Sequence, residues 1–175
     1  IRILNEFEDV VLATVCDPIA DGRNATADEY GIPERHSDLE MMLDSTHLDA
    51  VIVTSPAHLN AKLAKPCIER GLHVLMEKPP GLTVEKTREL ERAAKQSGSK
   101  VIVGWNRRFH PVITQTRALI LDHGPVTQLV GEFHKNINQQ VDSGSHTESI
   151  LDQLLLETPI HAIDTLRFLA DADVK

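Results

Sequence analysis

Residues 50–104 read AVIVTSPAHLNAKLAKPCIERGLHVLMEKPPGLTVEKTRELERAAKQSGSKVIVG, and this stretch decides the fold. It contains three short apolar runs rich in valine, at residues 50–54, 73–76 and 100–104. Two longer segments, residues 58–70 and 84–97, separate the runs, and a glycine follows each of them as a helix stop. Short apolar strands that alternate with helices predict a parallel sheet whose strands are buried on both faces.

The same alternation continues towards the N-terminus. Residues 10–16 form another apolar run, residues 20–30 are expected to form a helix that ends at Gly31, and residues 39–43 a short helix. The chain is therefore predicted to be an α/β protein with a doubly wound parallel sheet.

Dinucleotide-binding sheets of this kind carry a Gly-x-Gly-x-x-Gly turn after the first strand and an acidic residue after the second. That glycine pattern does not occur in the chain, whereas Asp17 follows the run at 10–16 and takes the place of the acidic residue. We therefore expect the first strand and its glycine turn to precede Ile1, and residues 1–7 to be the end of the first helix. A sheet without its central strand leaves backbone groups unpaired, so the chain by itself is expected to fold poorly and to be inactive.

Composition and charge restrict the class of protein. Hydrophobic residues make up 41% and charged residues 25% of the chain, as in ordinary soluble globular proteins. A net charge of -8 argues against a nucleic-acid partner, and no apolar stretch is long enough to span a membrane. The two cysteines, Cys16 and Cys67, do not form a Cys-x-x-Cys motif and are expected to be reduced thiols. These features predict a cytoplasmic protein with neither a nucleic-acid nor a membrane partner.

The pattern changes after Trp105, where we place a domain boundary. Residues 1–105 are predicted to be a partial dinucleotide-binding domain, and residues 106–175 the start of a second domain. The second part is expected to contain a helix at 111–123, a strand at 126–135, a polar loop or lid at 136–149 and a helix at 158–169.

Four short motifs follow one another along the chain. They are Thr-x-Pro at residues 54–56, Glu-Lys-Pro at 77–79, Gly-Trp-Asn-Arg-Arg-Phe at 104–109 and acid-x-x-x-His-x-x-Asp at 157–164. With these motifs in this order and spacing, residues 10–169 resemble the Gfo/Idh/MocA family of glucose–fructose oxidoreductases and inositol dehydrogenases.

The resemblance implies a Rossmann-like domain followed by an α+β substrate domain with an open antiparallel sheet. Such sheets commonly pack against a second subunit, so a homo-oligomer is expected. The resemblance also implies NAD(P)-dependent hydride transfer to or from a secondary alcohol of a sugar, inositol or related polyol.

Lys78 is the leading catalytic candidate. It follows a predicted parallel strand, and ligands bind beyond the carboxyl ends of such strands. Pro79 and Pro80 stiffen the turn that holds it. The resemblance implies that Lys78 exchanges a proton with a substrate hydroxyl beside the cofactor, and that Glu77 lies near the nicotinamide ribose. The alternative is a Glu–Lys pair on the surface in front of a loop.

Glu157, His161 and Asp164 are spaced so that they form one polar stripe on the last predicted helix. The resemblance implies that His161 assists proton transfer or orients the substrate and that Glu157 binds a hydroxyl. Asp164 is expected to orient His161 or the helix. The family has Asp where this chain has Glu157, and Gly where it has Pro159. The longer side chain of Glu157 changes the reach of the acid. The alternatives are a core histidine with solvated acids, and a zinc site made of the three residues; because no fourth ligand is evident, we assign no metal.

Asp17 is expected to bind the adenosine ribose of the cofactor. A carboxylate there accepts hydrogen bonds from both ribose hydroxyls and repels a 2′-phosphate, which favours NAD over NADP, although the nearby Arg23 would soften that preference. Asp17 can equally be a residue that ends a strand in the turn before Pro18.

The nicotinamide side is assigned to residues after the next strand. The resemblance places Thr54, Ser55 and Pro56 there, and it aligns a family histidine with Asn60, whereas His58 stands two residues earlier. Asn60 is therefore included among the cofactor-binding candidates, with the alternative that both residues simply open the helix.

Trp105 and Arg108 complete the predicted cofactor site at the junction of the two domains. An arginine can clamp a diphosphate or an acidic substrate. The alternative for Arg108 is a structural ion pair across the junction.

Two other functions stay open at this point. One is a non-catalytic sensor or scaffold that binds a nucleotide or a sugar. The other is a relative that cleaves glycosides and regenerates its NAD in each cycle.

Overall fold

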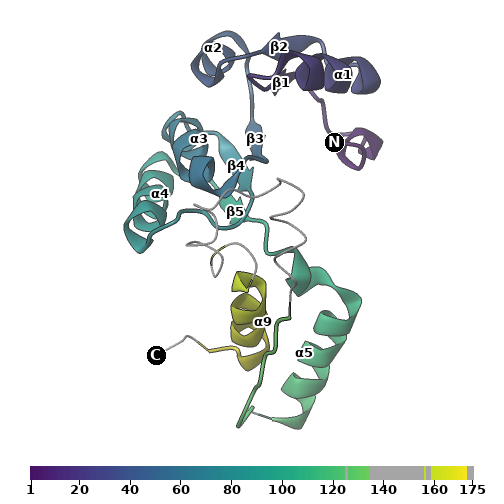
Figure 1. The fold of residues 1–175 in the computed structure, drawn as a ribbon, viewed down its shortest axis with the longest axis vertical. Helices are drawn as coiled ribbons and strands as arrows, with labels where there is room; N and C mark the ends of the chain where they lie inside the picture. The colour runs from purple at the N-terminus through teal and green to yellow at the C-terminus, as the bar shows by residue number, and fades with distance from the viewer. Residues whose placement is uncertain (125, 135–155, 157–158, 173–175) are drawn as a thin grey trace.

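A computed structural model of the chain describes residues 1–124, 126–134, 156 and 159–172 (Figure 1). The described strands are β1 (Thr14–Cys16), β2 (Glu34–His36), β3 (Ala50–Val53), β4 (His73–Met76) and β5 (Val101–Val103). The described helices are α1 (Ala20–Tyr30), α2 (Leu39–Ser45), α3 (Ala57–Glu69), α4 (Val84–Ser97), α5 (Pro111–His123) and α9 (Ile160–Ala170), with 3-10 turns η1 (Leu4–Glu6) and η2 (Asn106–Phe109).

The described strands form two parallel sheets. β1 pairs with β2, and β4 lies between β3 and β5. A dinucleotide-binding sheet has the strand order 3-2-1-4-5-6. The pair β2–β1 fits positions 3 and 2, the triplet β3–β4–β5 fits positions 4, 5 and 6, and no described strand occupies position 1. The predicted Rossmann-like α/β fold without its first strand is confirmed.

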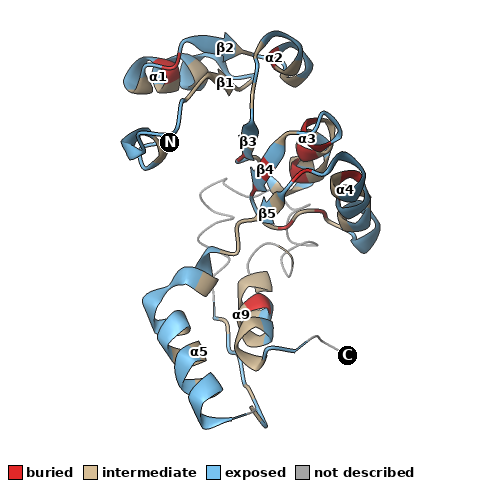
Figure 2. Cartoon of the chain, turned by 180° about the vertical axis from the view of Figure 1, so that it is seen from behind, coloured by how far each residue is buried: buried red, intermediate tan, exposed pale blue. Residues whose placement is uncertain are grey.

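The core lies between the three-stranded sheet and the helices α3 and α4. Buried apolar residues of β3, β4, α3 and α4 form one cluster, drawn among the red segments of Figure 2, and partly buried residues of β5 pack against it. The buried members are Val53, Ala64, Cys67, Ile68, Val74, Met76, Leu90 and Ala93. On the opposite face, Ile52, Leu75 and Ile102 are aligned across the three strands and are 43%, 41% and 62% exposed. The prediction that the strands are buried on both faces is therefore wrong for the described residues, because α3 and α4 cover the same face.

Local signals fix the helix ends. The ends of α1 and α4 are capped by Gly31 and Gly98, both with left-handed backbone angles that a side chain would strain (φ 65° and 75°). Thr83 accepts a hydrogen bond from the amide of Lys86 and so caps the start of α4. Both helices have the bounds that the sequence predicts.

Two predictions near the N-terminus are corrected. The apolar run at residues 10–16 forms a strand only over its last three residues, Thr14–Cys16, where β2 supplies a hydrogen-bonding neighbour. The expected helical tail at residues 1–7 is a single 3-10 turn. β2 itself was not predicted, because Glu-Arg-His has no apolar pattern and an edge strand does not require one.

The second part contains η2, α5, α9 and the segment 126–134, which runs beside α9 in Figure 1. The predicted strand at 126–135 is wrong for residues 126–134. This segment packs its backbone against a helix instead of pairing with a described strand, since a Cβ on Gly131 would lie 2.9 Å from the Leu166 side chain. The polar loop predicted at 136–149 lies outside the described residues, and the position of the domain boundary stays a prediction. None of the described helices has both the length and the apolar character needed to cross a membrane.

Candidate active site

The loop that carries Lys78 begins where β4 ends. The amide of Glu77 donates to the carbonyl of Val53 at the end of β3 (3.0 Å). On the other side, the amide of Gly104 after β5 donates to the carbonyl of Met76 (2.8 Å). Glu77 is exposed and Lys78 is half-buried. The three strand ends are thus tied together, and Lys78 lies at the carboxyl edge of the sheet, as the strand pattern predicts.

Asn60 lies beneath this loop, in the first turn of α3, and is fully buried. Its side-chain nitrogen donates to the carbonyls of Glu77 (3.1 Å) and Pro79 (2.9 Å), and its oxygen accepts from the Ser55 hydroxyl (2.8 Å). His58, by contrast, is exposed. The sequence suggested Asn60 only through an alignment. The feature that marks its buried position is a carboxamide in the first turn of a helix, and two of its partners lie 17 and 19 residues further along the chain.

His161 lies in the first turn of α9. Its ring meets the edge of the Trp105 ring at 89°, with 6.3 Å between the ring centroids. Burial lowers the pKa of His161, and the positive charges of Arg107 and Lys78 lower it further, while nearby carboxylates oppose the shift. The Nδ1 atom is buried and has no hydrogen-bond partner among the described residues. The charge of Lys78 therefore acts on His161, although the two residues lie far apart in the sequence.

Asp164 is the buried acid of α9. It is 5% exposed, and both of its carboxylate oxygens accept from Arg108, one of them from Nε at 2.8 Å. The Arg108 guanidinium also lies 5.4 Å from the centre of the Phe168 ring. Asp164 thus fastens α9 to η2. This arrangement is the structural ion pair that the sequence leaves open as the alternative for Arg108.

Of the three residues considered as an alternative zinc site, the structure describes His161 and Asp164. Glu157 lies outside the described residues, and the Asp164 carboxylate is engaged by Arg108. Within the described ranges, no group of three or more His, Cys, Asp or Glu residues is arranged to hold a metal ion.

The predicted cofactor contacts lie at two places. Asp17 follows β1, where one carboxylate oxygen accepts from the amide of Ile19 (2.7 Å) and the backbone carbonyl accepts from Arg23. Thr54 and Pro56 are exposed after β3, beside the Lys78 loop. The nicotinamide-side candidates thus lie at the same strand ends as Lys78, near Trp105 and His161. Asp17 instead follows β1, which belongs to the other sheet (Figure 1).

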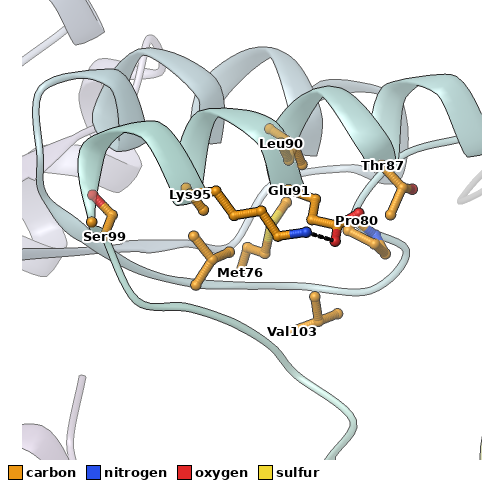
Figure 3. A pocket seen from close by; sticks show the side chains of 11 residues that line it. Met76, Pro80, Thr87, Leu90, Glu91, Lys95, Ser99 and Val103 are labelled. Atoms are coloured by element: carbon orange, nitrogen blue, oxygen red, sulfur yellow. Dashed lines mark hydrogen bonds and ion pairs between the residues drawn. The ribbon is translucent and has the colours of Figure 1, made fainter.

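A cavity of about 530 Å³ lies between α4 and the strands β4 and β5 (Figure 3). Met76, Leu90 and Val103 line it. Glu91 and Lys95 also line it and form an ion pair with each other. Neither Lys78 nor His161 lines it. The cavity therefore does not belong to the candidate active site.

Comparisons with known proteins agree with this geometry. The family described as "Oxidoreductase family, NAD-binding Rossmann fold" matches residues 1–105. Inositol 2-dehydrogenase of Salmonella paratyphi B is 25% identical over 176 residues, covering 99% of this chain and 51% of the relative. D-xylose 1-dehydrogenase (NADP(+)) 2 of Haloferax volcanii is 27% identical over 152 residues, covering 86% and 47%. The chain thus spans about half the length of the curated relatives it matches.

The fold is also found in solved structures. Scyllo-inositol dehydrogenase from Lactobacillus casei, with bound NAD(H) and scyllo-inositol, superposes with a TM-score of 0.81 at 21% identity, covering 97% of this chain and 51% of that one. This likeness agrees in fold with the family match over residues 1–105, which assigns the chain to a family. The chain belongs to the oxidoreductase family with an NAD-binding Rossmann fold.

Proposed function

We propose that the full-length protein carrying this chain transfers a hydride between NAD(P) and a secondary alcohol of a sugar, inositol or related polyol. The observation that carries the proposal is the place of Lys78 at the carboxyl end of β4, where backbone hydrogen bonds join this strand to the ends of β3 and β5. Its charge also lowers the pKa of His161 on α9. A histidine with a lowered pKa beside a lysine from another element is typical of acid–base sites. The names of the curated relatives, an inositol and a xylose dehydrogenase, support the substrate class.

In this proposal Lys78 exchanges the hydroxyl proton of the substrate at its Nζ atom. The bound nicotinamide supplies the hydride chemistry. His161, whose pKa is lowered by burial and by neighbouring cations, positions the same hydroxyl or relays its proton through a ring nitrogen. Glu157 is proposed to bind a second hydroxyl.

The proposed cofactor contacts lie at the strand ends. Thr54, Ser55, Pro56 and Glu77 follow β3 and β4, where they would hold the nicotinamide and its ribose, with Trp105 beside them. Asp17 would accept from the adenosine ribose and so favours NAD over NADP. Arg23, bonded to the Asp17 carbonyl, is the residue that would weaken this preference. Arg108 is proposed to act through its ion pair with Asp164 rather than on the diphosphate.

We also propose a cellular context and an assembly for the full-length protein. Both cysteines are free thiols, which fits a reducing cytoplasm. A homo-oligomer assembled through a C-terminal sheet stays a proposal from the resemblance.

The test is Lys78→Met in the full-length protein, with NADH formation measured over a panel of inositols, pentoses and glucosides. General acid–base groups contribute about 10²- to 10⁴-fold to a rate, so kcat should fall by that factor. NADH affinity, measured by its fluorescence, should change little. Lys100→Met, a surface change outside the site, is the control. Undiminished turnover in Lys78→Met would refute the proposal.

A further inference from the structure

The Asn60 side chain holds the Lys78 loop on both sides of the lysine. The two carbonyls that accept from Asn60 belong to Glu77 and Pro79, the residues on either side of Lys78. The third bond, from Ser55, connects the same carboxamide to the loop after β3. One buried group therefore joins the loop of the proposed proton donor to the loop of the proposed nicotinamide contacts.

Only a carboxamide satisfies all three partners. The two carbonyls can only accept, so the –NH₂ group of Asn60 must face them, and its oxygen is left for the Ser55 hydroxyl. An ionised aspartate of the same shape cannot donate, and a leucine of similar volume makes no hydrogen bond. Either replacement would leave the two carbonyls without this partner, and the bond to Pro79 is buried.

The surroundings leave Asn60 little freedom. It is 0% exposed, and Pro79 above it is also fully buried. On both sides of the loop, backbone bonds from Glu77 to Val53 and from Gly104 to Met76 fix the neighbouring strand ends. The backbone at Lys78 is thus fixed from three directions, and the charge of its half-buried side chain lowers the pKa of His161.

We infer that Asn60 is a positioning residue: it fixes the backbone on both sides of Lys78 so that the ammonium group stands where the substrate proton is exchanged. The inference rests on the proposed function. Displacing a reacting group by about 1 Å can cost about 100-fold in rate even when the change lies outside the reacting atoms. Loss of Asn60 should therefore lower kcat far more than it weakens NADH binding.

The test is a double-mutant cycle in the full-length protein with Asn60→Leu and Lys78→Met. Asn60→Leu alone should lower kcat about 100-fold. If Asn60 acts through Lys78, adding Asn60→Leu to Lys78→Met should lower the residual rate by less than about 3-fold, because coupled groups are not additive. The control is Asn24→Leu, the same replacement at an exposed position of α1, which should retain wild-type turnover.

A second variant separates positioning from packing. Asn60→Asp keeps the shape and the acceptor for Ser55 but loses both donors, so it should show the same loss of kcat and the same lack of additivity. A loss that multiplies with that of Lys78→Met would overturn the inference, as would wild-type kcat in a folded Asn60→Leu. Failure of both Asn60 variants to fold would assign the residue to stability and also overturn it. Full activity of Lys78→Met would instead refute the proposed function, so the two failures are distinguishable.

Discussion

Breaking the ion pair between Arg108 and Asp164 should have unequal effects, depending on which partner is removed. Asp164 is 5% exposed, while the Arg108 side chain is 33% exposed and can be reached by water. Arg108→Leu leaves a buried carboxylate without its counter-ion, which costs about 3–5 kcal/mol. Asp164→Leu leaves an arginine that water can hydrate. The unfolding free energy should therefore fall by about 1.5–3 kcal/mol, as for the loss of a hydrogen bond to a charged group.

The double variant is the decisive measurement. Replacing both partners removes both charges together, so it should be less destabilised than Arg108→Leu alone. Urea unfolding of the full-length protein, followed by circular dichroism, gives the order of the midpoints. Lys95→Leu, which breaks an exposed pair on α4, should shift the midpoint least. Equal midpoints for the two single variants, or a double variant below Arg108→Leu, would refute the reasoning.

Three further predictions concern titration, reactivity and capping. The pKa of His161 in the folded protein lies below the unfolded value of about 6.5. The stabilising contribution of His161 is therefore complete above that pH and is lost as the pH falls through the folded pKa. His161→Gln should flatten the dependence of the unfolding free energy on pH between about pH 8 and about pH 5. Burial raises the pKa of Cys67 to about 11, so iodoacetamide should label Cys16 first and Cys67 only after urea is added, as mapped by mass spectrometry; early labelling of Cys67 would contradict its burial. Thr83→Ala should cost about 1 kcal/mol through the lost cap of α4, while Thr83→Ser should retain it; equal melting curves would exclude the cap.

Features with local causes could be predicted from the sequence. A capping threonine and a left-handed glycine act within one helical turn, so the bounds of α4 were correct. The place of Lys78 followed from a general rule about strand ends. His161 was expected near Lys78 only by resemblance, and the structure gives this pairing its electrostatic basis.

Features that depend on distant partners could not be predicted in the same way. The polar strand β2 exists because β1 lies beside it, and the segment 126–134 is not a strand because it packs against α9. The bonds of Asn60 reach 17 and 19 residues along the chain, and no periodicity encodes them. Which alternative holds for Arg108 likewise depended on a carboxylate 56 residues away.

The two separate sheets also determine how the chain should behave at high concentration. Of the strands that the structure describes, only β4 has a hydrogen-bonded neighbour on both sides. Open edges recruit other strands, and the exposed row of Ile52, Leu75 and Ile102 adds an apolar face to them. In colloidal terms, these surfaces make the interaction between two copies attractive. The second virial coefficient of the isolated chain should therefore be negative. Its solubility should depend on the exposed sheet surfaces rather than on its net charge.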